Sequence, residues 1–138
     1  MKFVSTRVVT ADVARLADFY ELVTGVAAIR PAPVFAELIT ATATFAIGDV
    51  SMVPVFAPGA AEAAANRSAI FEFLVDDVDA EYQRLSAAGV EIVTEPAVMP
   101  WGNRVFFLRD PDGNLVGLFK PETAEAVERF RDRPYAAS

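Results

Sequence analysis

The chain has 138 residues, of which 54% are hydrophobic, and its formal net charge is −7 at pH 7. It contains neither Cys nor His, which excludes disulfides, Cys nucleophiles, Ser-His-Asp triads and metal sites built on thiolate or imidazole. The acidic balance argues against nucleic acid as a partner, and no apolar run nears the ~20 residues of a membrane span. The first residues lack the apolar core of a secretory signal, so we expect a cytoplasmic protein.

The first half of the chain predicts one helix among several strands. Residues 3–10 are rich in β-branched side chains and predict a strand. Asp12 is expected to be the N-cap of a helix whose apolar residues recur at helical spacing, and Gly25 is expected to end it. A short strand is predicted at residues 26–30, and Pro31 and Pro33 are expected to end it. Further strands are predicted at residues 35–40, 44–47 and 52–56.

The Ala-rich segment 58–68 is expected to be a linker, after which the same order of elements returns. Strands are predicted at residues 69–75, 91–94, 104–109 and 115–120, and a helix at residues 78–88. The last two strands are joined by the sequence DPDG, in which Pro fixes φ and Gly accepts a positive φ, so a tight turn is expected. An exposed helix is predicted at residues 122–133.

The two halves are related by a weak internal repeat with a spacing of 65 residues, seen in the pairs Asp12-Val13 and Asp77-Val78. Each half, residues 1–57 and residues 69–121, is therefore expected to be a βαβββ module within a single domain over residues 1–138. The predicted fold class is α+β, with the two modules forming a cupped, mostly antiparallel sheet. A ligand is expected in the cleft between the halves.

Four segments, namely VARLADFY, VDDVD, PWGNR and RDPDGNL, occur in a characteristic order and spacing. Over about residues 3–121 the chain resembles the vicinal oxygen chelate superfamily, also called the glyoxalase/bleomycin resistance/extradiol dioxygenase superfamily. The last two segments are most similar to the bleomycin-resistance branch, whose members bind a drug in a groove shared by two subunits. The resemblance implies the glyoxalase/bleomycin resistance fold and a homodimer.

Metal-dependent members of that superfamily carry ligands at fixed strand positions, usually His or Glu. The register of the motifs places these positions at Ser5, Ile70 and Gly117 in this sequence. Ser, Ile and Gly cannot together hold a divalent metal. The resemblance, with this departure, therefore implies a protein that uses no metal at this site and no cofactor.

Further candidate ligand-binding residues share strand faces with these positions. Arg7 lies two residues after Ser5, and Glu72 lies two residues after Ile70, so each shares the strand face of the earlier residue. Arg7 and Glu72 are therefore expected to point to the cavity, either toward a ligand or toward each other as an ion pair. Glu37 either faces the cavity or lies on the solvated side of its strand.

Aromatic residues and one further arginine complete the candidate site. Trp101 either stacks on an aromatic or cationic ligand or closes the end of the sheet. Arg104 either reaches the groove or lies at an exposed strand end. Phe107 is expected to face the cavity, and Phe119 is either another lining residue or part of the core.

These features predict a metal-independent protein that binds and sequesters a small molecule, such as an antibiotic. The ligand is expected to be apolar or aromatic, and the acidic chain would favour a cationic one. One alternative is a lyase, isomerase or dioxygenase-type enzyme of the same superfamily, either metal-free or with a metal held by Glu37, Glu72 and solvent. Another is an interaction domain whose cleft is filled by its own side chains. No catalytic residue is assigned.

Overall fold

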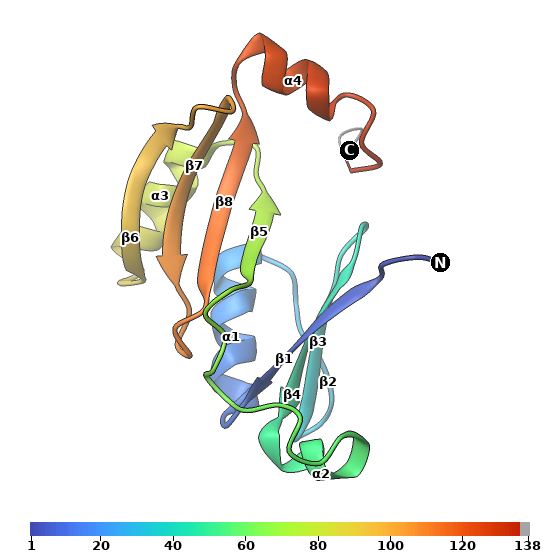
Figure 1. Cartoon of the computed structure of the whole chain (residues 1–138). Helices are drawn as coiled ribbons and strands as arrows, with labels where there is room; N and C mark the ends of the chain where they lie inside the picture. Colours follow the sequence, from blue (N-terminus) through green and yellow to red (C-terminus); the bar gives the residue numbers. More distant parts are fainter. Residues whose placement is uncertain (136–138) are drawn as a thin grey trace. The chain divides into compact units, whose positions relative to one another are not determined.

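The computed structural model describes residues 1–135 and divides the chain into two compact units (Figure 1). The first unit is made of residues 1–66 with residues 111–113, and the second is made of residues 67–110 and the chain from residue 114 onward. No helix within residues 1–135 is long and apolar enough to cross a membrane.

Both units repeat one order of elements. The first contains β1 (Ser5–Thr10), α1 (Val13–Thr24), β2 (Ile29–Ala32), β3 (Phe35–Ile39), β4 (Thr44–Asp49), the 3-10 helix η1 (Val50–Met52) and α2 (Val53–Phe56). The second contains β5 (Ile70–Leu74), α3 (Val78–Ala87), β6 (Glu91–Val98), β7 (Asn103–Arg109), β8 (Leu115–Pro121) and α4 (Ala124–Phe130). The predicted α+β class and the repeated βαβββ order are therefore confirmed.

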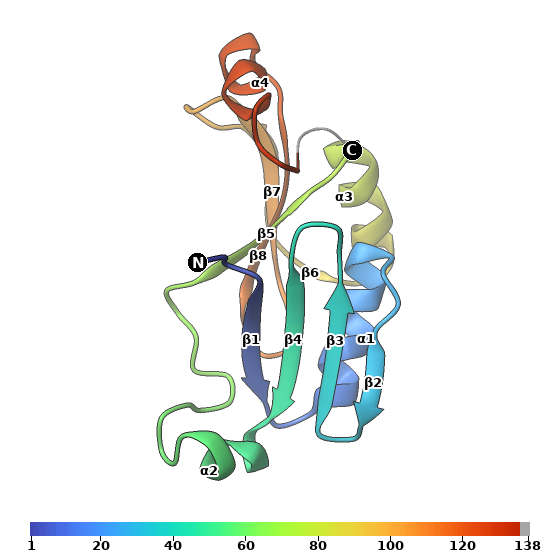
Figure 2. The ribbon, with the colours of Figure 1, turned by 90° about the vertical axis from the view of Figure 1, so that its right-hand side faces the viewer.

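Each unit has a four-stranded mixed sheet with the same topology. The first sheet has the order β1-β4-β3-β2, seen face-on in Figure 2, and the second has the order β5-β8-β7-β6. In each sheet the first strand runs parallel to the last one, and the other two pairings are antiparallel. Because the helix in each unit follows the first strand, it crosses one face of its own sheet.

The helices begin as the repeat predicts. Asp12 caps α1, with its Oδ1 accepting a hydrogen bond of 3.0 Å from the Arg15 backbone N–H. Asp77 caps α3 in the same way, with its Oδ1 3.0 Å from the backbone nitrogen of Ala80. Gly25 ends α1 in the left-handed conformation, with φ of 71°, which a residue without a Cβ adopts without strain.

The core of each unit lies between its helix and its sheet. In the first unit the ring centroids of Tyr20, from α1, and Phe45, from β4, are 4.4 Å apart. In the second unit Tyr82, from α3, and Phe106, from β7, are 5.4 Å apart in an edge-to-face arrangement. Residues that alternate with these along the strands lie on the opposite face of each sheet.

We call the faces opposite α1 and α3 the first and second distal faces. Ladder partners share a face, so the strand registers define the members of each. The first distal face carries Ser5, Arg7, Val9, Ile29, Ala32, Phe35, Glu37, Ile39, Thr44, Ala46 and Gly48. The second carries Ile70, Glu72, Leu74, Asn103, Val105, Phe107, Arg109, Leu115, Gly117, Phe119 and Pro121.

Two local predictions were wrong. Residues 52–56 form η1 and α2 rather than a strand. The Asp49 side chain accepts a hydrogen bond of 2.8 Å from the Ser51 N–H and starts a helical turn, and Pro54 follows near the start of α2, where its missing N–H costs nothing. Pro31 lies within β2 rather than ending it, because β2 pairs only with β3 and an edge strand tolerates proline.

Candidate functional site

A row of four residues crosses the first distal face. Arg7 is the ladder partner of Ala46, Ala46 is the partner of Glu37, and Glu37 is the partner of Ile29. The row therefore places one cation and one carboxylate on the same face with a single small side chain between them. Ser5 belongs to the neighbouring row, beside Thr44.

Arg7 is held between two aromatic rings. Its guanidinium carbon lies 5.7 Å from the ring centroid of Phe35 and 5.6 Å from that of Phe56, distances typical of cation–π contacts. Within residues 1–135 its guanidinium has no carboxylate partner and makes no side-chain hydrogen bond. Its positive charge is therefore available to another molecule.

Glu37 lies on the first distal face and is half-buried. Its carboxylate makes no ion pair or hydrogen bond with any other residue that the structure describes. The strand register places Glu37 on the sheet face opposite α1, which is also the face of Arg7.

The second distal face brings together five of the predicted residues: Ile70, Glu72, Phe107, Gly117 and Phe119. Glu72, Gly117 and Phe107 form one row across three strands, at the place in the second sheet that Arg7, Ala46 and Glu37 occupy in the first. Two aliphatic side chains of β5 stand out on this face, with Ile70 exposed by 47% and Leu74 by 41%. Exposed aliphatic side chains therefore contribute to the second distal face.

Gly117 is covered by an aromatic ring. A Cβ placed on Gly117 would lie 2.9 Å from Cε1 of Phe107 and 3.6 Å from a methyl group of Val105. The ring of Phe107 thus takes the space that a longer side chain at residue 117 would need.

Trp101 lies in the turn before β7 and is 56% exposed. Its backbone carbonyl accepts a hydrogen bond of 2.6 Å from Nη2 of Arg129, in α4. Phe130, also in α4, has its ring centroid 5.8 Å from that of Phe119. These two contacts fix α4 to the Trp101 end of the second distal face and leave the indole ring accessible.

Arg104 is not on the distal face with these residues. It alternates with Phe107 along β7 and lies on the face that packs on α3, where its Nε and Nη2 each approach the Asp79 carboxylate to 2.8 Å. These hydrogen bonds lower the pKa of Asp79 and raise the pKa of Arg104. Arg104 was expected either to reach a ligand groove or to lie at an exposed strand end, and it lies at the start of β7, where it ties that strand to α3.

Three neighbours of the predicted residues were not among the candidate ligand-binding residues. Phe35 shares the strand parity of Glu37, so parity could have placed it on the first distal face. Phe56 could not have been placed, because its segment was predicted to be a strand. Asn103 is 8% exposed, and its Oδ1 has no hydrogen-bond partner among residues 1–135. It shares the second distal face with Phe107.

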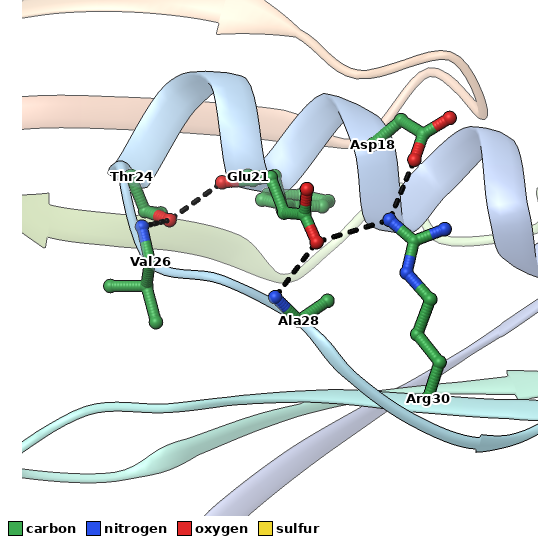
Figure 3. Close-up of polar contacts among 7 residues, drawn as sticks. Asp18, Glu21, Thr24, Val26, Ala28 and Arg30 are labelled. Carbon is green, nitrogen blue, oxygen red and sulfur yellow. Dashed lines mark hydrogen bonds and ion pairs between the residues drawn. The ribbon is translucent and has the colours of Figure 1, made fainter.

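A groove of about 280 Å³ lies on the first unit beside the start of α1. It is lined by Val13, Ala14, Arg30, Pro31, Ala32, Pro33 and Phe35. The charge of Arg30 is already matched, because its Nη2 lies 2.6 Å from Asp18 and 3.1 Å from Glu21 (Figure 3). Glu21 also accepts a hydrogen bond from the Ala28 N–H, which with Arg30 lowers its pKa. The groove therefore offers apolar surface without an unpaired charge.

The sequence was compared with the profiles of known protein families. The sequence profile of the Glyoxalase/Bleomycin resistance protein/Dioxygenase superfamily matches residues 2–118. The chain belongs to this superfamily.

Known proteins of the superfamily and its fold resemble the chain to different extents. "Putative glyoxylase CFP32" of Mycobacterium bovis and of Mycobacterium tuberculosis is 41% identical over 49 residues, which is 36% of this chain and 19% of that protein's length. A glyoxalase/bleomycin resistance protein/dioxygenase from Nocardioides has a TM-score of 0.75 at 23% identity, covering 90% of this chain and 85% of its own. A protein of unknown function from Agrobacterium tumefaciens has a TM-score of 0.73 at 28% identity, covering 86% and 93%. At these identities the solved structures support the fold.

The residues of this superfamily member do not fit a metal ion at the expected positions. Ser5, Ile70 and Gly117 supply one hydroxyl between them, and the space at Gly117 is filled by Phe107. Within residues 1–135 no group of three or more Asp and Glu side chains is arranged to hold a metal.

Proposed function

We propose that the protein binds a small apolar or aromatic molecule without a metal ion, in the manner of an antibiotic-sequestering protein. The observation that carries this proposal is the contact between Phe107 and Gly117. At the position where the resemblance implies a metal-binding glutamate, this chain has no side chain, and an aromatic ring lies there instead. The second distal face thus offers a ligand a hydrophobic surface.

The composition of that face supports a small-molecule site. Exposed aliphatic side chains of β5 and the half-buried rings of Phe107 and Phe119 surround one carboxylate, that of Glu72. The Glu72 carboxylate has no ion pair with any residue in the described part of the chain, so it suits a cationic group on the ligand. Apolar surface with a few polar groups is typical of small-molecule sites, and members of the superfamily usually bind small molecules.

We also propose that the protein is a homodimer. Ile29, Ile39 and Ile70 are each about half exposed, and all three belong to strands that carry the distal faces. A second copy of the chain would remove such apolar surface from water. Light scattering coupled to gel filtration should therefore give twice the mass of one chain.

Binding is tested by metal analysis together with titration of Trp101 fluorescence against a panel of aromatic antibiotics. We expect no stoichiometric metal and a saturable fluorescence change that EDTA does not alter. One tightly bound metal ion per chain, or binding that EDTA abolishes, would contradict the proposal.

A matched pair of variants locates the ligand. Leu74→Gln places an amide on the second distal face and should weaken binding by about tenfold, because the ligand loses apolar contact there. Leu22→Gln makes the same change at a residue of α1 that is also 41% exposed, and it should leave binding unchanged. Equal losses in the two variants would place the ligand elsewhere.

A further inference from the structure

We propose that the first distal face binds an aromatic zwitterion, with Arg7 holding its carboxylate and Glu37 holding its protonated amine. The ligand class is that of a free aromatic amino acid. This inference rests on the proposed function in assuming that the protein binds a small molecule without a metal.

Arg7 has the properties of a carboxylate anchor. The rings of Phe35 and Phe56 contact its guanidinium through cation–π interactions, which leave its N–H donors unused. Four other arginines of the chain are neutralised by carboxylates within 4 Å: Arg30, Arg84, Arg104 and Arg131. Arg7 has no such partner among the residues that the structure describes, although the chain carries an excess of acidic residues.

The rings also fix the direction of the Arg7 side chain. Phe35 lies on the same sheet face, and Phe56 approaches from α2. Gly48 lies beside the Arg7 stem, since a Cβ on Gly48 would come 3.7 Å from Arg7 Cδ. A planar guanidinium held in this way can bind a carboxylate through two parallel hydrogen bonds.

Glu37 supplies the opposite charge at a distance that a small molecule can bridge. One strand, β4, separates it from Arg7, so their Cα atoms are about 10 Å apart by ordinary strand spacing. The residue between them is Ala46, whose buried methyl group is the smallest side chain that could stand there. A molecule with a carboxylate and an ammonium group a few bonds apart would place each against its counter-charge.

The surroundings of this pair favour an aromatic ligand. Phe56 is 53% exposed, so its ring can contact another ring as well as Arg7. Ile29, beside Glu37 in the same row, is 51% exposed and adds apolar surface. Ring stacking and burial of this surface would add to the two charge contacts.

Three indoles that differ only in their charged groups test the inference by isothermal titration calorimetry: tryptophan, indole-3-propionate and tryptamine. Tryptophan should bind most tightly to the wild-type protein. Arg7→Gln should weaken tryptophan and indole-3-propionate by about tenfold or more and leave tryptamine unchanged, because only the first two carry a carboxylate. Glu37→Gln should weaken tryptophan and tryptamine and leave indole-3-propionate unchanged.

Two further variants act as controls. Arg15→Gln removes an exposed positive charge from α1 and should leave all three affinities unchanged. Arg7→Lys keeps the charge but loses the planar fork, so carboxylate affinity should lie between those of the wild type and Arg7→Gln. Circular dichroism and thermal melts show that each variant is folded.

The outcomes separate this inference from the proposed function. Equal affinity of wild type and Arg7→Gln for indole-3-propionate would overturn the assignment of Arg7. Binding of the antibiotic panel without binding of any indole would overturn the zwitterion site and leave the proposed function standing. Binding of neither set in the absence of metal would overturn both.

Discussion

The ring of Phe107 lies against Gly117, its ladder partner on β8, with Cε1 at 2.9 Å from the position of a Cβ on residue 117. Side chains at such paired positions usually extend side by side from the sheet. Here one partner has no side chain and the other lies over it. The pair therefore accounts for both the absence of a metal-binding side chain at residue 117 and the aromatic character of the second distal face.

Gly117→Ala should destabilise the protein by about 1–3 kcal/mol, because the new methyl group overlaps the Phe107 ring and forces it to move. Urea unfolding followed by Trp101 fluorescence measures the change. Gly48→Ala is the matched control in β4 of the first sheet, where the nearest atom to the new Cβ would be at 3.7 Å, an ordinary contact. The contact would be refuted if both variants had wild-type stability.

Gly102→Ala should be more damaging than Gly59→Ala, although both glycines have positive φ values, 94° and 73°. A Cβ on Gly102 would lie 2.1 Å from Oγ1 of Thr123 and 2.8 Å from Cβ of Ala126, whereas no atom lies within 4 Å of a Cβ on Gly59. Both variants suffer the backbone strain of a positive φ, so the difference between their losses of unfolding free energy measures the overlap of the new methyl group with α4. We expect an additional loss of about 1–3 kcal/mol in unfolding free energy. Equal losses would show that α4 can move aside freely.

The Asp79–Arg104 pair should make stability depend on pH in the acid range. Hydrogen bonds from Arg104 hold the pKa of Asp79 below its ordinary value of 3.8. A carboxyl group whose pKa falls on folding stabilises the fold above its unfolded pKa, and this contribution is lost as the pH falls through the folded pKa. The difference in melting temperature between wild type and Arg104→Gln should therefore be complete at neutral pH and shrink below pH 3.8.

A pH series of thermal melts tests this pair. Arg67→Gln, at an exposed arginine without an ion pair within residues 1–135, should match the wild type at every pH. A melting-temperature difference for Arg104→Gln that stayed constant down to the lowest pH would show that Arg104 acts through packing rather than through the Asp79 carboxylate.

The two helix caps should contribute similarly to stability. Asp12→Ala and Asp77→Ala each remove a side-chain hydrogen bond of 3.0 Å at a helix start and should each cost about 0.5–2 kcal/mol. Asp76→Ala removes a neighbouring carboxylate that caps no helix and should change stability little. Chemical denaturation measures all three, and a cost for Asp76→Ala equal to that for Asp77→Ala would indicate a general charge effect.

The repeated architecture could be predicted from the sequence because its signals are local. The N-caps Asp12 and Asp77 and the glycines that follow the helices fix where each βαβββ module begins and turns. Strand parity then predicted that Glu72 shares the face of Ile70, and the register shows Glu72 on that face together with Gly117, a position taken from the resemblance. Parity works here because the side-chain period of a strand is two.

The sequence prediction failed at residues 52–56 and was undecided at Arg104, for two different reasons. The run at residues 52–56 is apolar enough for a strand, and only the Asp49 turn and the placing of Pro54 make it helical. For this reason Phe56 was not foreseen beside Arg7. The position of Arg104 was left open between a groove and an exposed strand end because its partner, Asp79, is 25 residues away in the sequence.

The parallel pairing at one edge of each sheet has a consequence for synthesis of the chain. In the first sheet Ser5 pairs with Thr44 and Thr10 pairs with Asp49, so β1 must wait for the rest of its module before it gains a hydrogen-bonding partner. Every strand of that sheet lies within residues 5–49. All its partners have therefore been translated before β5 leaves the ribosome, and the first sheet can form while the second is still being made. The second sheet closes an interval of similar length, from Ile70 to Leu115, and can do so only after β8 has been made.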